Sequence, residues 1–237
     1  MLISNNFTYT KGSTLPRVAP FALFMAFIAI QEGMQYLASN DIVGIPYSWF
    51  LYLYPVKTVS VGILLLIFRK SYQEIISRDL ARISITVSSV FTGLAVFILW
   101  INMDWSWATI GTLKGFDPTI LSGEFTYCII VGFRILGASI IVPVMEELFW
   151  RSWLLRFLIS HDFQSIPIGS FKWMSFIIGT LMFGLEHNLW LAGIMAGGAY
   201  SLLLYSTKSL AQCILAHAVT NFVLGLYILQ SGRWELW

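Results

Sequence analysis

Charged side chains are scarce in this 237-residue sequence, at 11% of the total, whereas hydrophobic residues make up 57%. A soluble globular domain carries roughly 25% charged residues, so this chain has too few polar side chains to cover a water-exposed surface. The net charge of +2 is too small, and the basic residues are too dispersed, to indicate nucleic-acid binding. A soluble domain and a nucleic-acid-binding protein are therefore both excluded.

Several chemical signatures are also missing. Cys128 and Cys213 lie in separate apolar segments without a CxxC pair, which disfavours a disulfide framework or a zinc knuckle. The sequence has no HExxH zinc motif and no GxSxG-like elbow, and no aspartate falls in a predicted membrane segment, so serine and paired-aspartate proteases fit poorly. The polar start of the chain lacks a short apolar run followed by a small-residue cleavage site, so no removable signal peptide is predicted.

Long apolar runs are what the sequence has instead, with a mean hydropathy of +0.76. About 20 apolar residues cross a bilayer as a helix, and the stretch 148–160 either extends the fourth span or lies along the interface. We predict an all-α, polytopic transmembrane helical bundle of seven to eight membrane helices, with a polar segment 1–19 and a single membrane domain 20–237. The predicted spans are 20–38, 47–68, 84–103, 126–147, 172–187, 189–206 and 208–230.

The loops between these spans predict an orientation. Four basic residues fall in the 69–82 loop and three in the 148–172 stretch, whereas the 104–125 loop has three acidic residues against Lys114 alone. By the positive-inside rule the basic loops face the cytoplasm. The N-terminus is therefore predicted to be cytoplasmic, with the C-terminus outside for seven spans and inside for eight.

Ionisable side chains inside membrane segments are costly unless they have a partner or water. Glu32, Lys57, Arg134 and Glu186 are each interpreted as a salt-bridge or snorkelling residue. Glu32, Lys57 and Arg134 also motivate an alternative function, a transporter or channel, although the sequence has neither repeated halves nor paired broken segments.

A second group of polar residues has a distinctive spacing. Glu147 and Arg151 are related as i and i+4, which makes them neighbours on one helix face in the favourable order. Glu146 points about 100° away and has no cation beside it on the helix. A carboxylate with apolar neighbours and no fixed partner is suited to act as a general base.

Two further membrane segments carry histidines. His187 follows Phe183 at i+4, and His217 precedes Asn221 at i+4, which places that pair on one helix face. A neutral imidazole can orient a water or accept its proton. A His–Asn pair can offer two N–H donors to a developing oxyanion. Phe183 itself is interpreted as a packing residue.

Together, the patterns EExxxR at 146–151, FxxxH at 183–187 and HxxxN at 217–221 resemble the three motifs of the CAAX prenyl protease and bacteriocin-processing intramembrane proteases. The resemblance covers about residues 126–225, the predicted catalytic core. The run 133–156 is further similar to a bacterial branch, the exosortase-associated CAAX prenyl protease-related proteins.

The resemblance implies an intramembrane endopeptidase of the bacterial inner or plasma membrane that cleaves a membrane-associated or lipid-modified protein. Glu146 would activate a water with help from His187, while His217 and Asn221 would stabilise the oxyanion. Glu147 and Arg151 would support the site. A non-catalytic scaffold or immunity protein of the same fold is the alternative.

Metal use is open at this point, because Glu146, His187 and His217 could supply three ligands to zinc, while a metal-free glutamate mechanism is the rival. For the motifs to converge, the fourth helix must either start deeper in the membrane and run on through about residue 158, or kink at Pro143. We predict the former.

Overall fold

The computed structural model describes residues 14–111 and 115–237, so Lys114 and most of the predicted polar segment 1–19 lie outside the described residues. The described chain is built of helices and loops, without a strand. Six helices are uninterrupted: α1 (Leu15–Ser39), α2 (Tyr47–Ile67), α3 (Ile83–Trp100), α7 (Trp173–Leu185), α8 (Trp190–Thr207) and α9 (Leu210–Ser231). Short 3-10 turns occur at Arg69–Ser71, Ser77–Ala81, Ser106–Ala108, Pro118–Ile120, Phe163–Ser165 and Trp234–Leu236.

The fourth apolar segment forms one continuous 34-residue helix from Glu124 to Phe157. It consists of α4 (Glu124–Leu136), α5 (Val142–Glu147) and α6 (Leu155–Phe157), joined by π-helical turns at Gly137–Ile141 and Leu148–Leu154. The prediction that this helix continues to about residue 158 is confirmed, and the stretch 148–157 is an extension of it rather than a separate membrane helix.

Five of these helices are long and apolar enough to cross a membrane: α1, α2, α3, the Glu124–Phe157 helix and α9. At 13 residues α7 is shorter than a full span, because about 20 residues are needed. The helical membrane architecture is thus confirmed, whereas the count of seven to eight spans is not. Large apolar side chains such as those of Ile83, Phe125 and Met174 are exposed on the outside of the bundle, as a lipid-facing surface requires.

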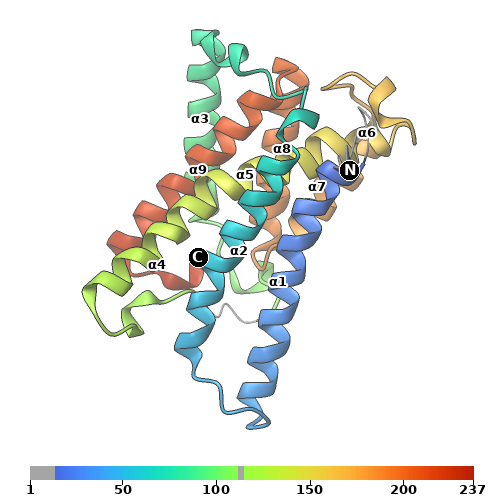
Figure 1. Ribbon diagram of the computed structural model, residues 1–237. Helices are drawn as coiled ribbons and strands as arrows, with labels where there is room; N and C mark the ends of the chain where they lie inside the picture. The colour runs from blue at the N-terminus through green and yellow to red at the C-terminus, as the bar shows by residue number, and fades with distance from the viewer. Residues whose placement is uncertain (1–13, 112–114) are drawn as a thin grey trace, which may run out of the picture.

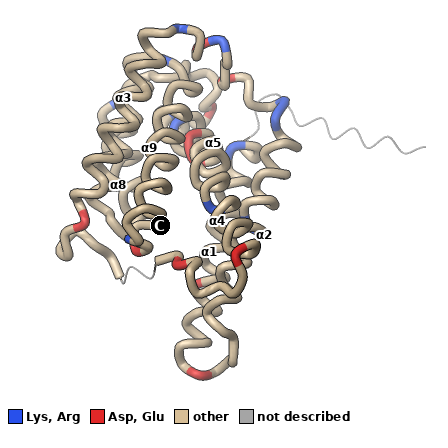
Figure 2. Tube along the Cα trace, turned by 90° about the vertical axis from the view of Figure 1, so that its left-hand side faces the viewer, with Lys and Arg blue, Asp and Glu red and all other residues tan. Residues whose placement is uncertain are grey.

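The helices run between two ends of an elongated bundle (Figure 1). At one end the loop between α2 and α3 contacts the starts of α1 and α9. Arg17 Nε donates a hydrogen bond to Glu74 at 2.7 Å, and the Ser209 hydroxyl donates one to Asp79 at 2.5 Å. At the other end Arg233 pairs with Asp104 at 2.7 Å. In Figure 2 most of the basic residues are in the upper half, together with some acidic ones, and the lower loops carry mainly acidic residues. The predicted basic and acidic loops therefore fall at opposite ends, and which end faces the cytoplasm stays a prediction.

Close packing positions the elements that carry the motifs. Gly93 lets α3 approach α9, since a Cβ at Gly93 would lie 2.4 Å from the Ala216 carbonyl oxygen. In α7 and α8, a Cβ on Gly193 would lie 2.9 Å from Gly184 Cα and 3.2 Å from His187 Nδ1. Small residues at such crossings are typical of membrane helix packing, and here they hold the His187 and His217 segments against their neighbours.

Candidate active site

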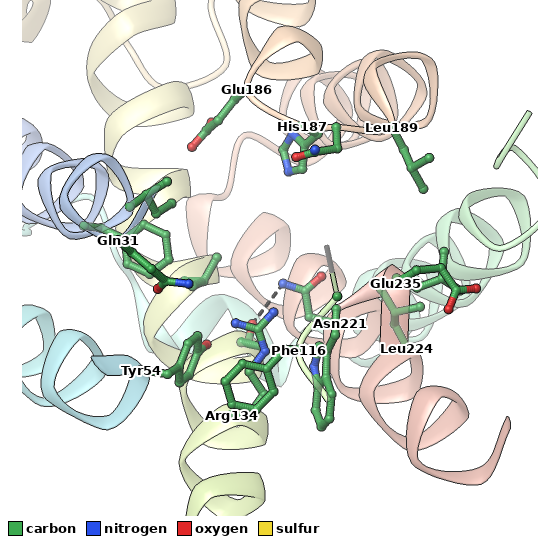
Figure 3. A pocket seen from close by; sticks show the side chains of 18 of the residues that line it. Gln31, Tyr54, Phe116, Arg134, Glu186, His187, Leu189, Asn221, Leu224 and Glu235 are labelled. Carbon is green, nitrogen blue, oxygen red and sulfur yellow. Dashed lines mark hydrogen bonds between the residues drawn. The ribbon is translucent and has the colours of Figure 1, made fainter. Parts of the chain in front are cut away.

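A cavity of about 700 Å³ lies between the helices, and all four predicted catalytic residues line it: Glu146, His187, His217 and Asn221. Its walls come from every long helix of the bundle, from the turn between α7 and α8, from the loop before α4 and from the last residues of the chain. In Figure 3, His187 and Glu186 lie on one wall, and Asn221 and Arg134 lie opposite them. Four residues spread over about 75 positions of sequence thus meet around one space.

Glu146 is a buried carboxylate on α5, the short α-helical segment between the two π-helical turns. Its Oε2 has no hydrogen-bond partner and lies 4.0 Å from His217 Nε2. That distance is too long for a hydrogen bond, but it allows both atoms to contact one water molecule. π-Helical turns occur often at functional sites, and here they flank the residue with the unpaired oxygen.

His217 is held from two sides. Its Nδ1 donates a hydrogen bond to Glu147 Oε1 at 2.9 Å, and the Tyr200 ring stacks on the imidazole at 4.8 Å between centroids. Tyr200 is fixed in turn, because its hydroxyl donates to Thr220 Oγ1 at 2.8 Å. A carboxylate can only accept, so Nδ1 carries the proton and Nε2 is presented to Glu146 and the cavity.

Glu147 and Arg151 form the ion pair that their spacing predicts, at 3.3 Å, with exposed side-chain fractions of 0% and 1%. The Arg151 guanidinium also donates to the Gly197 carbonyl at 3.1 Å and lies over the Phe183 ring at 4.3 Å. Phe183 is buried against these groups, which confirms its interpretation as a packing residue. Glu147 therefore connects the arginine to His217, while Glu146 remains available to the cavity.

His187 lies in the turn after α7, because that helix ends at Leu185, two residues before the predicted end of the span. Its Nδ1 donates to the Phe183 carbonyl at 2.8 Å, and the edge of Trp100 packs against its ring at 5.3 Å. Since a carbonyl only accepts, the neutral imidazole keeps its lone pair on Nε2. His187 can therefore accept a hydrogen bond from a water in the cavity.

Asn221 lines the cavity and also donates a hydrogen bond to a backbone carbonyl of the Glu124–Phe157 helix. Val142 donates to the Gly137 carbonyl as an i, i+5 bond, and the next bond of that series would join Pro143 to the Ala138 carbonyl. Proline has no N–H, and the Ala138 carbonyl instead accepts a hydrogen bond from Asn221 Nδ2 at 2.9 Å. The amide of Asn221 keeps a second N–H and its oxygen for other partners.

A preassembled metal site does not fit this arrangement. Over residues 14–111 and 115–237, no three His, Cys, Asp or Glu side chains are grouped as metal ligands. The Nδ1 of His217 is hydrogen-bonded to Glu147, and its Nε2 lies 4.0 Å from Glu146 Oε2. Zinc binds histidine nitrogens and carboxylate oxygens at about 2.0–2.2 Å. The metal-ligand role of Glu146, His187 and His217 stays a prediction.

Sequence reasoning missed three features of this site. Tyr200 gave no signal beyond an aromatic residue in an apolar helix, yet it orients His217. Glu186 was interpreted as a salt-bridge or snorkelling residue, but it lines the cavity and accepts a hydrogen bond from Trp150 Nε1 at 3.2 Å. The same interpretation is wrong for Lys57 and Arg134, which line the cavity without a carboxylate of the described chain within ion-pair distance.

Fold and site together define a class: a polytopic helical membrane protein in which a carboxylate, two imidazoles and an amide surround a cavity between the helices. A family model described as type II CAAX prenyl endopeptidase Rce1-like matches residues 130–223, about two fifths of the chain. An Rce1-like domain is therefore found there, which confirms the resemblance drawn from the three motifs and supports a peptidase. No curated protein and no solved structure matches the chain.

Proposed function

We propose that this protein is an intramembrane endopeptidase that cleaves a membrane-associated or lipid-modified protein by glutamate-activated attack of water. The observation that carries the proposal is the convergence of three distant motifs on one cavity, with the unpaired Glu146 Oε2 4.0 Å from His217 Nε2. The Rce1-like domain at 130–223 contains all of these residues and supports the same reaction class.

The chemistry follows from the donors and acceptors around the cavity. Glu146 takes a proton from a water whose oxygen attacks the carbonyl carbon of the substrate, and His187 Nε2 accepts a hydrogen bond from the same water. His217 takes up a proton on Nε2 from water in the cavity, and Glu147 at Nδ1 balances the charge of the imidazolium. Its Nε2–H then donates to the developing oxyanion together with the free N–H of Asn221. Glu146 then gives its proton to the leaving amine as the peptide bond breaks.

The test is cleavage by purified full-length protein carrying Glu146→Gln, which keeps shape and polarity but removes the base. General-base catalysis contributes about 10²- to 10⁴-fold, so the rate should fall by at least about a hundredfold while thermal unfolding stays close to that of the parent. A matched control is Glu32→Gln, the same change on the exposed face of α1 at the rim of the cavity. This control should retain activity.

Full activity in Glu146→Gln would exclude the proposed mechanism. Two other functions make different predictions for the same proteins. A non-catalytic scaffold or immunity protein keeps its cellular phenotype in the Glu146→Gln form. A transporter or channel moves solute across vesicles in a manner that depends on Lys57 and Arg134, which line the cavity.

A further inference from the structure

Lys57 is a buried cation with no acidic partner among the described residues. Its side chain is 6% exposed and lies over the Phe24 ring at 4.2 Å and the Tyr54 ring at 5.0 Å. Aromatic faces attract a cation, but they do not supply the charge-balancing acceptor that a buried ammonium group needs. Lys57 lines the same cavity as Glu146.

Arg134 is the second unbalanced cation of this cavity. Its guanidinium lies over the rings of Tyr54 at 4.3 Å and Phe116 at 4.9 Å, and its Nε is buried without a hydrogen-bond partner. In Figure 3, Arg134 lies beside Tyr54 and Phe116, across the cavity from His187. Tyr54 therefore contacts both cations and joins them into one subsite.

We propose that Lys57 and Arg134 form an anion subsite that binds a carboxylate of the peptide substrate. Two neighbouring cations without a counter-charge are costly in a low-dielectric bundle, and an entering carboxylate satisfies both through charge-assisted hydrogen bonds. This inference rests on the proposed peptidase function, because it assigns the anion to the molecule that Glu146 attacks.

The depth of Lys57 favours a peptide over a lipid headgroup as the source of the anion. Lys57 is at the middle of α2, which begins at Tyr47 and ends at Ile67. At 1.5 Å per residue the ammonium-bearing residue is about 15 Å from either end of that helix. Lipid phosphates lie outside the hydrocarbon core, which is about 30 Å thick, so they lie far from the centre of α2.

The distance to Glu146 suits an extended peptide. Arg134 and Glu146 are on the same continuous helix, and their separation in sequence corresponds to about 18 Å along the axis. An extended chain advances about 3.3–3.6 Å per residue. A carboxylate bound at Arg134 would therefore lie up to about five residues beyond the bond under attack.

The experiment uses binding rather than cleavage. Full-length Glu146→Gln protein in phosphatidylcholine nanodiscs is titrated into three fluorescent apolar hexapeptides of one sequence. The first ends in a free carboxylate, the second ends in an amide, and the third ends in an amide with one internal Glu. The anisotropy of the fluorophore reports binding, and no hydrolysis is required.

At least one carboxylate peptide is expected to bind about tenfold or more tightly than the plain amide, since hydrogen bonds between charged groups have that strength. The two carboxylate peptides distinguish a chain terminus from an acidic side chain. Lys57→Gln and Arg134→Gln should each remove this preference but leave amide binding unchanged. Arg233→Gln, which changes a half-buried arginine that pairs with Asp104 and is not among the residues lining the cavity, should keep the preference.

The amide peptide also monitors folding. If a glutamine variant also loses binding of the amide peptide, Arg134→Lys is the deciding variant. It keeps a cation at this position, so it must keep the preference for carboxylate peptides over the amide peptide. Equal binding of all three peptides to the parent protein overturns the proposal, as does a preference that survives both substitutions. Phosphatidylglycerol binding that requires Arg134, combined with equal peptide binding, would assign the cations to lipid and also overturn it. The binding experiment uses protein in which Glu146 is already replaced, so it does not depend on proteolysis. A failure to bind carboxylate peptides is therefore distinguishable from a failure of the proposed peptidase function.

Discussion

At the scale of single residues, the adjacent glutamates have opposite environments. Glu147 is fully buried between Arg151 and the Nδ1 of His217, so both of its neighbours are positively charged or proton-donating groups. Glu146 points to the cavity, and one of its oxygens lacks a partner. One peptide step thus separates a structural carboxylate from one that is available for chemistry, because consecutive helix residues point about 100° apart.

This division predicts that the two glutamates fail in different ways. Glu147→Gln leaves Arg151 buried without its counter-charge and should lower the free energy of unfolding by about 3–5 kcal/mol. Glu146→Gln should lower activity with little effect on stability. Thermal unfolding of both variants in one detergent provides the comparison. Arg233→Gln, which breaks a partly exposed pair, should change stability by no more than about 1 kcal/mol. If Glu147→Gln lost no more stability than Arg233→Gln, Glu147 would not be the structural counter-charge of Arg151.

At the scale of elements, the Glu124–Phe157 helix depends on a side chain from α9. Pro143 leaves the Ala138 carbonyl open in the i, i+5 series, and Asn221 donates to it. A buried carbonyl without a donor costs about 1–3 kcal/mol. The hydrogen bond therefore fixes the π-helical turn that ends five residues before Glu146, and it places the Asn221 amide at the cavity.

We predict that Asn221→Ala destabilises the protein by about 1–3 kcal/mol, because it leaves the Ala138 carbonyl unsatisfied. Pro143→Ala restores a backbone N–H at the position that can donate to that carbonyl. The double variant should therefore recover most of the lost stability, so the two changes are not additive. Additive losses measured by thermal unfolding would show that Pro143 is not the reason Asn221 is needed there.

The sequence predicts most of the helices but only part of the site. Apolar runs of about 20 residues give α2, α3 and α9 to within a few residues, because each of these helices is long and apolar enough to cross a membrane. The three motifs supply four of the residues that line the cavity, namely Glu146, His187, His217 and Asn221. The π-helical turns, the stacking of Tyr200 and the proximity of His217 to Glu146 arise from packing between distant segments, which no local pattern encodes. Within the described part of the chain, the lack of a carboxylate at ion-pair distance from Lys57 is equally a tertiary property.

At the scale of the whole molecule, one ion pair at the basic end joins three parts of the chain. Glu74, in the loop between α2 and α3, accepts hydrogen bonds from Arg17 Nε at 2.7 Å and Arg17 Nη2 at 2.8 Å. It also accepts one from the Ser152 hydroxyl on the Glu124–Phe157 helix. Burial alone would raise the pKa of Glu74, but the Arg17 guanidinium and the Ser152 hydroxyl outweigh it and hold the pKa below 4.5.

The lowered pKa of Glu74 predicts a pH-dependent contribution to stability. A carboxyl that titrates lower in the folded state stabilises the fold above its unfolded pKa, about 4.5, and loses that contribution as pH falls through the folded pKa. The difference in melting temperature between the parent and Glu74→Gln should therefore be constant from pH 7 to about 5 and shrink below about 4.5. Glu32→Gln removes an exposed carboxylate that has no ion pair within the described part of the chain, and it should show no such trend. A Glu74→Gln difference that stays constant down to pH 3 would mean that the charge of Glu74 does not hold the loop, α1 and the Glu124–Phe157 helix together.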